Sequence, residues 1–102
     1  MNEKKRNAEQ TLAELVEDLK LRAACCAHRM NQQKEEGDLE RNHVNSGELI
    51  EQLNVLRFLG REAESAVWDD DGYSICEYVK IDGMKIYERE KPVKKEKKVA
   101  EQ

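Results

Sequence analysis

The chain has 102 residues with 18 Lys or Arg and 22 Asp or Glu, and its formal net charge is −4. A chain of this length forms one domain, and it is too small and too charged to enclose a deep catalytic pocket. No segment approaches the roughly 20 apolar residues that a membrane span requires. The polar residues after Met1 do not resemble a secretory signal, so we expect a cytoplasmic protein without membrane contact.

The three cysteines do not indicate a disulfide scaffold. Their number is odd, and Cys25 and Cys26 are adjacent, so on a helix their side chains would point about 100° apart. Free thiols in a short chain are typical of a reducing compartment, which agrees with a cytoplasmic location.

The first expected element is a helix over about residues 3–36. Apolar or small residues recur there at spacings of 4, 3, 4, 3 and 4, the pattern of a coiled-coil-like seam that packs on a second helix. These residues are Leu12, Val16, Leu19, Ala23, Cys26 and Met30. No Pro or Gly interrupts the segment before Gly37.

A second helix is expected over about residues 46–67, after a loop of roughly ten residues. Asn45 is placed to cap it, with Glu48 reaching back to complete a capping box. The same spacing continues through Leu49, Leu53, Leu56, Gly60, Ala63 and Val67. The two helices therefore form an antiparallel hairpin. Val55 and Phe58 lie off the seam, so we expect the C-terminal strands or a second copy of the chain to cover them.

Two strands are expected over about residues 74–81 and 84–89, because Asp82-Gly83 between β-rich runs is the signal for a two-residue hairpin turn. The register then places Tyr78 opposite Tyr87 and Lys80 opposite Lys85. The other face of the hairpin is expected to join the core, and it carries Ile75, Val79, Ile81, Met84 and Ile86.

The expected fold class is therefore α+β, with a long antiparallel helical hairpin followed by a two-stranded β-hairpin in one domain over residues 1–90. Residues 91–102 are rich in Lys and Glu and are expected to form a disordered tail. Residues 89–102 carry a net charge of +3, which leaves −7 on the rest of the chain. The acidic body disfavours nucleic-acid binding by the molecule as a whole.

One face of the predicted β-hairpin is a candidate ligand site. It combines tyrosines with cations, as stacking on a base and neutralisation of a phosphate would require. Its residues are Tyr78, Lys80, Lys85, Tyr87 and Arg89. Alternatively, the tyrosines stabilise the hairpin and the lysines guard its edges. Arg57 and Arg61, one helical turn apart, either line an anion site across a dimer or pair with nearby glutamates.

Metal binding and catalysis are not expected. Cys25 and His28 share a helix face, but no second ligand pair follows at zinc-site spacing. Asp69 and Asp71 resemble part of a calcium loop that lacks its closing glutamate. A Cys or Ser nucleophile would require a cleft that two helices and a hairpin do not provide. We therefore expect no metal, no cofactor and no enzymatic activity.

The leading hypothesis is a small, acidic, non-catalytic interaction protein that binds and modulates, or inhibits, another macromolecule, as accessory proteins of phages and mobile elements do. The modest core of so short a chain favours a homodimer. A nucleic-acid-binding enzyme with a basic groove would suit the acidic body as a target. The residues expected to contact the partner are Val55, Phe58, Trp68, Asp69, Asp70 and Asp71. The alternatives are a nucleotide-binding module and, third, a nucleic-acid-binding protein that uses the hairpin and the basic tail.

Overall fold

In the computed structural model, residues 2–90 and the side chains of residues 9–90 are described. The elements in chain order are α1 (Asn2–Glu36), α2 (Leu39–Phe58), β1 (Ala63–Asp70), β2 (Tyr73–Ile81) and β3 (Met84–Glu88). The α+β class and the helical hairpin are thus confirmed, although the sheet has one strand more than expected. The tail expected over residues 91–102 lies outside the described part of the chain.

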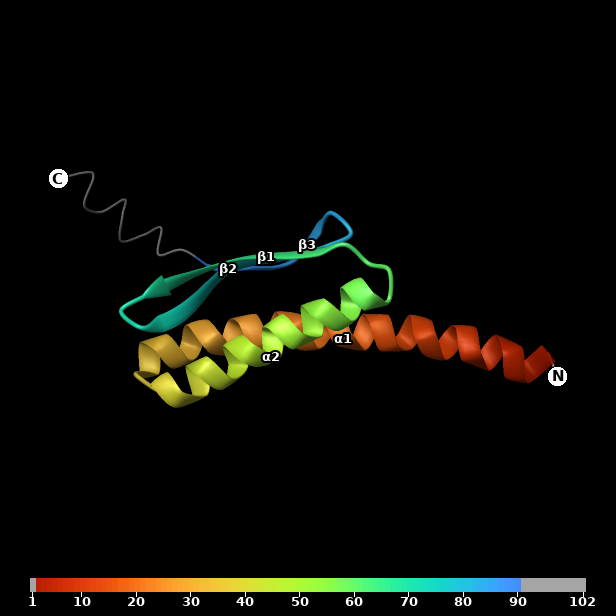
Figure 1. Ribbon diagram of the computed structural model, residues 1–102, viewed down its shortest axis with the longest axis horizontal. Helices are drawn as coiled ribbons and strands as arrows, with labels where there is room; N and C mark the ends of the chain where they lie inside the picture. The colour runs from red at the N-terminus through yellow and green to blue at the C-terminus, as the bar shows by residue number, and fades with distance from the viewer. Residues whose placement is uncertain (1, 91–102) are drawn as a thin grey trace.

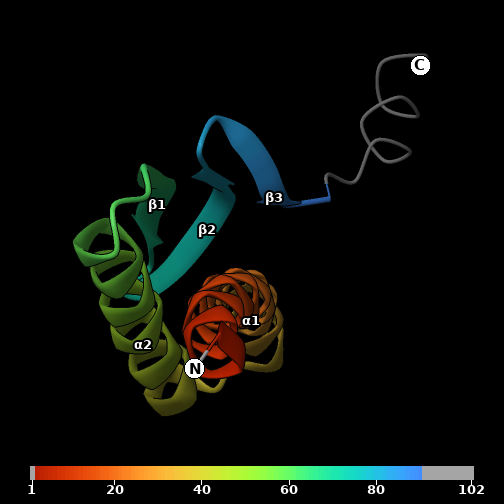
Figure 2. The same ribbon diagram turned by 90° about the vertical axis from the view of Figure 1, so that its right-hand side faces the viewer.

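The molecule has two layers (Figure 1). The helices form one layer, and the antiparallel sheet, in the order β1-β2-β3, lies over it. The view along the helices shows α1 beneath β2 and β3, with α2 on the side of β1 (Figure 2). The core fills the space between the layers, and its largest fully buried apolar residues are Met30, Leu49, Leu56, Val79 and Ile81. Among the described residues, no helix is long and apolar enough to cross a membrane.

The second helix starts earlier than we expected. Gly37, at φ 75°, ends α1, and Asp38 caps α2 by accepting a hydrogen bond from the Arg41 backbone N–H. Asn45, the expected cap, lies buried inside α2 instead. Asp38 is as good a cap as Asn45 and directly follows the glycine. The connection is therefore a tight turn, and the helices can pack together from that turn onward.

The second helix also ends earlier, at Phe58, and the residues expected to be its last turns form β1. The chain turns at Gly60, at φ 90°, and β1 then pairs along its length with β2. Ala63 and Val67 continued the helical spacing, but the strand pairing with β2 outweighs this local signal. The segment that resembled part of a calcium loop forms the end of β1, at Asp70, and the hairpin turn at Asp71 and Gly72.

Both hairpins of the sheet close with an Asp-Gly pair. The expected turn at Asp82 and Gly83 is present, with φ values of 53° and 84°. Asp71 and Gly72 form a second turn of the same kind, with φ values of 57° and 89°. Two consecutive residues with positive φ are characteristic of the type I′ turn, whose twist matches that of the flanking strands.

The register between β2 and β3 agrees with our expectation only beside the turn. Lys80 faces Lys85 as expected, but the register then shifts, so that Val79 faces Tyr87. Tyr78 therefore faces Glu88, and the expected pairing of Tyr78 with Tyr87 is wrong. A bulge of this kind depends on how the strands curve over the helices, which the strand pattern alone does not reveal.

A second register shift, between β1 and β2, changes which residues of β2 enter the core. Ala66 faces Tyr78, whereas Val67 faces Cys76, so Glu77 is the additional residue. Cys76, which strict alternation from Val79 would place on the outer face, is consequently fully buried. Met84, which we expected in the core, is exposed beside the hairpin turn.

Two asparagines join the helical layer to β2. The segment of β2 that extends beyond β3 has main-chain groups that no β3 residue meets. Asn42 of α2 donates from Nδ2 to the Ser74 carbonyl (2.9 Å) and accepts the Ser74 N–H (2.8 Å). Asn31 of α1 does the same for Cys76, with both distances 2.9 Å. The amides thus satisfy the groups that another strand would otherwise pair with.

Candidate interaction surfaces

The outer face of the sheet brings together three of the predicted ligand-site residues. The Nζ atoms of Lys80 and Lys85 lie 5.6 and 5.4 Å from the centroid of the Tyr78 ring. Each ammonium also has a carboxylate nearby, Glu64 at 3.9 Å for Lys80 and Glu88 at 3.1 Å for Lys85. These are cation–π contacts with partly neutralised cations, so both ammonium groups have partners within the sheet itself.

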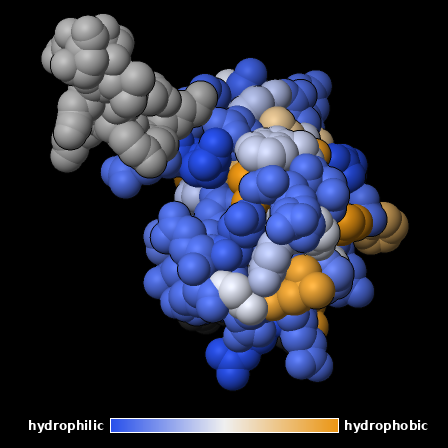
Figure 3. All heavy atoms as spheres, turned by 90° about the vertical axis from the view of Figure 1, so that its left-hand side faces the viewer, coloured by the Kyte–Doolittle hydropathy of each residue, from blue (hydrophilic) through white to orange (hydrophobic). Residues whose placement is uncertain are grey.

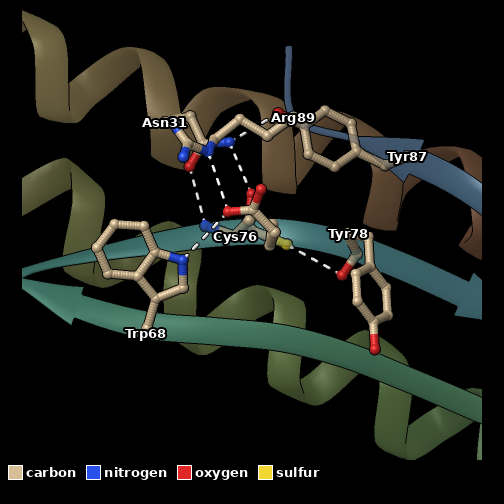
Figure 4. A network of polar contacts seen from close by, with 7 residues as sticks. Asn31, Trp68, Cys76, Tyr78, Tyr87 and Arg89 are labelled. Carbon is tan, nitrogen blue, oxygen red and sulfur yellow. Dashed lines mark hydrogen bonds and ion pairs between the residues drawn. The ribbon is translucent and has the colours of Figure 1, made fainter. Parts of the chain in front are cut away.

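Tyr87 and Arg89 do not belong to that group. The Tyr87 hydroxyl accepts a hydrogen bond from Asn31 Nδ2 (2.7 Å), and burial raises the pKa of the phenol. Arg89 pairs with Glu77 (3.2 Å), and its guanidinium lies 5.7 Å from the ring centroid of Trp68. Figure 4 shows these residues gathered around the main chain of Cys76; the Tyr78 carbonyl accepts a hydrogen bond from Cys76 Sγ (3.5 Å), but the Tyr78 ring points away from the group. The predicted five-residue ligand face is therefore divided between two places.

A groove of about 730 Å³ runs between α1 and the end of the sheet. Its walls include His28 and Glu35 of α1 on one side and Trp68, Ile75 and Arg89 on the other. The charges in it have mixed signs. A groove of this composition presents no uniform field to attract a phosphate.

The two candidate arginines of the α2–β1 region are each held by a different partner. Arg57 donates from Nε (3.0 Å) and from its terminal guanidinium nitrogen (2.7 Å) to the Ala63 carbonyl. Arg61 pairs with Asp82 at 3.1 Å. Asp82 also accepts the Glu62 N–H (3.0 Å), and this bond, followed by the charge of Arg61, lowers the pKa of Asp82. Both arginines thus tie the chain after α2 to the sheet.

The thiols of the two buried cysteines have low reactivity. Burial is the main reason that the pKa of Cys26 rises to about 11 and that of Cys76 to about 12. A thiol with such a pKa stays protonated at neutral pH and is a poor nucleophile. Cys25 is exposed. Within residues 9–90, no three His, Cys, Asp or Glu side chains lie close enough together to hold a metal ion.

The side of α2 that points away from the core carries four residues spaced 7, 4 and 3 apart. All of them are exposed, and we call them the outward face of α2: Val44, Glu51, Val55 and Phe58. Glu48 lies toward α1, where its Oε1 accepts a long hydrogen bond from the buried Cys26 Sγ (3.7 Å). Phe58 is 87% exposed. We expected the strands or a second copy to cover Val55 and Phe58, and the strands do not, because they pack on the side of α2 that carries Leu53 and Leu56.

Apolar groups also reach the surface elsewhere. Figure 3 looks onto the end of the molecule where α1 turns into α2, and it shows apolar atoms in patches between hydrophilic ones. Trp68 is partly exposed on β1, next to Asp69 and Asp70. Asp70 pairs with Lys34 at 3.5 Å, so the acidic segment from Asp69 to Asp71 is partly neutralised. Asp71, at the tip, is exposed.

Asn31 and Asn42 were missed as important residues by reasoning from sequence. Both lie among other polar residues, and Asn42 falls in a segment that we interpreted as a loop. An asparagine in mid-helix is a mild warning, since this residue usually favours caps and turns. That signal alone does not identify the strand that the amide binds.

The comparisons with known proteins add no relative. No family model matches the chain, and neither the curated proteins nor the solved structures contain a significant match.

Proposed function

We propose that the protein is a small, non-catalytic interaction protein that binds another protein through the outward face of α2 and modulates its activity. The observation that supports this proposal is Phe58, whose ring is 87% exposed on a helix whose opposite side is fully packed. Val44 and Val55 extend the same face over several turns. Apolar surface grouped in this way on a small protein is typical of an interaction site.

The chemistry of this face indicates the kind of partner surface that would fit it. Glu51 lies between the apolar residues, so the face is an apolar stripe with a negative charge near its centre. A complementary surface has a hydrophobic groove flanked by Lys or Arg. The basic cleft of a nucleic-acid-binding enzyme meets this description, and occupying such a cleft would inhibit the enzyme.

The proposal is tested by capture followed by a binding isotherm. The immobilised protein is used to isolate a stoichiometric partner from the cells that produce it, and the purified partner is titrated with variants. Phe58→Glu should weaken binding at least about tenfold, because an exposed interface aromatic is a typical hot spot. Leu21→Glu is the matched control, since Leu21 is also an exposed apolar helical residue but lies on α1. Equal affinities for both variants would exclude the outward face of α2.

The second candidate function is nucleotide binding at Tyr78, Lys80 and Lys85. It is favoured by one observation, the position of two ammonium groups beside one aromatic ring. A bound nucleotide would raise the melting temperature by several degrees. The double variant Tyr78→Ala with Lys80→Glu should abolish that shift. A panel of mono-, di- and cyclic nucleotides that leaves the melting temperature unchanged would discard this candidate.

A further inference from the structure

Helix α1 is much longer than its partner. It has 35 residues and α2 has 20, and the N-terminal part of α1 extends past the end of α2 and past the sheet (Figure 1). Val16 is the first buried residue of α1 among the described side chains, and every side chain from residue 9 to residue 15 is exposed. We call residues 2–15 the overhang, a helical segment about 21 Å long at 1.5 Å per residue.

The overhang continues an apolar seam without a partner. Leu12 is 49% exposed and Leu15 is 42% exposed. Together with Ala8 and Leu19 in the sequence, they are spaced 4, 3 and 4 apart, which is the repeat of helices that pair in coiled coils. An isolated helix of about 12–15 residues is marginal in water, and the exposed side chains of residues 9–15 give the overhang no packing to stabilise it. A second helix along this seam would supply that packing.

The charges along the overhang indicate which helix that is. In the sequence, Lys4, Lys5 and Arg6 stand near the start of the overhang, beside the single acidic residue Glu3. Glu14, Glu17 and Asp18 stand near its end, where Glu17 also pairs with Lys20 (3.1 Å) and Asp18 with Arg22 (2.8 Å) on the same helix. In an antiparallel pair of identical overhangs, the basic start of each lies next to the acidic end of the other. A parallel pair would place like charges together, so the segment is complementary to itself only in the antiparallel arrangement.

We propose that the protein forms a homodimer in which two overhangs pair antiparallel across a two-fold axis. A contact of this kind is isologous and closes with two copies. It uses none of the residues of the outward face of α2, so it can fail or succeed independently of the proposed function. The contact between two overhangs is smaller than the roughly 1,200 Å² of a standard interface, so the dimer should dissociate on dilution in the micromolar range.

Sedimentation velocity of the full chain across about 1 to 500 μM tests the dimer, spanning the affinities expected of a small interface. The wild type should shift from the 11.9 kDa monomer toward twice that mass. Leu12→Glu with Leu15→Glu should remain monomeric throughout, with circular dichroism showing that the core stays folded. Leu21→Glu is the control, because Leu21 is 63% exposed on the opposite side of the same helix. A monomeric wild type, or equal loss of the dimer in both variants, would overturn the proposal.

A charge exchange tests the antiparallel arrangement. One variant replaces residues 4–6 with glutamates, and the other replaces Glu14, Glu17 and Asp18 with lysines. Each variant alone should lose self-association, because both ends of its overhang then carry the same charge. Mixed together, the two variants should form a heterodimer, and a chain with both sets of changes should again form a homodimer. Persistent homodimers of either single variant would contradict antiparallel pairing and would indicate a different interface.

Discussion

Asn42 shows how a single side chain can join two layers of a small protein. It has no exposed surface, and its amide spans from α1 to β2, with Nδ2 donating to Met30 and Ser74 (both 2.9 Å). A buried polar group is normally costly, but here its hydrogen-bonding atoms are satisfied by main chain. The residue therefore contributes orientation as well as stability.

We predict that Asn42→Ala lowers the free energy of unfolding by about 3 kcal/mol, because it leaves the Ser74 N–H and C=O without partners in a dry interface. Urea denaturation measures this change. Asn54→Ala is the control on the same helix, where the exposed amide bonds only to Arg57, and its effect should stay within about 0.5 kcal/mol. Equal destabilisation by both changes would show that the Asn42 contacts with β2 contribute little.

The thiols provide a second prediction for individual residues. Cys25 is exposed, whereas Cys26 and Cys76 are buried, with pKa values raised to about 11 and about 12. A raised pKa keeps both buried thiols protonated at pH 8, so they lack the reactive thiolate as well as access to a reagent. A disulfide reagent should therefore modify one thiol quickly in the native protein and all three in urea.

The thiol assignment has a direct check. Cys25→Ser should remove the fast phase and leave the slow phase unchanged. A fast phase that persists in this variant would mean that the layer covering Cys26 or Cys76 opens readily.

Only part of the residue-level detail could be predicted from sequence. The alternation of β2 correctly indicated that Val79 and Ile81 are core residues. It failed for Cys76, because a single additional residue, Glu77, reverses which side chains point inward. The size of a bulge depends on distant packing between helices and sheet, and no local pattern encodes that packing.

At the scale of elements, glycine is required by the backbone conformation of the hairpin turns but not by that of α2. Gly72 has a φ of 89° in the turn between β1 and β2, whereas Gly47 lies in α2 without positive φ. A Cβ at either position would meet no atom within 4 Å, so backbone conformation alone decides the effect of a substitution.

We predict that Gly72→Ala destabilises the protein by about 1–2 kcal/mol, the cost of a left-handed backbone for a residue with a Cβ. Gly47→Ala should instead stabilise the protein by about 0.5–1 kcal/mol, because alanine favours helix. Thermal or urea unfolding of the two variants measures these shifts. Shifts of the same sign would contradict the turn assignment.

The elements themselves were predicted unevenly. The long first helix and the Asp82-Gly83 hairpin carried strong local signals, and both are present. The segment from residue 63 to residue 67 continued the helical spacing and was expected to be helix, but its pairing with β2 decided the outcome. Asp71-Gly72 was the available clue, since an Asp-Gly pair before one strand indicates that another strand precedes it.

For the whole molecule, the stacking of sheet on helices predicts a single cooperative unfolding transition. The layers share one core, and Asn31 and Asn42 bond across the boundary between them. Fluorescence of Trp68, the only tryptophan, reports on the sheet, and circular dichroism at about 222 nm reports mainly on the helices. The two signals should give the same urea midpoint. A lower midpoint for fluorescence would mean that the sheet detaches before the helices unfold.

The stacking of the layers was beyond sequence reasoning. The composition and the helical seam indicated a two-helix hairpin whose apolar surface needs further cover. The sheet provides that cover. The side of α2 on which the sheet would lie could not be predicted, because Val55 and Phe58 are as apolar as the residues that are buried. Val55 and Phe58 were therefore expected beneath the strands or a second copy of the chain, whereas the strands leave both residues exposed.

The hydrogen bonds from the Asn31 and Asn42 amides to β2 also imply that the helices and the strand tolerate substitution to different degrees. The atoms of Cys76 and Ser74 that Asn31 and Asn42 bind belong to the main chain, and every amino acid except proline offers those same atoms. The side chains of β2 can therefore be substituted where packing allows, whereas neither asparagine has an equivalent substitute. In a library of random variants, we expect the folded members to retain both asparagines and to vary more freely in the side chains of β2.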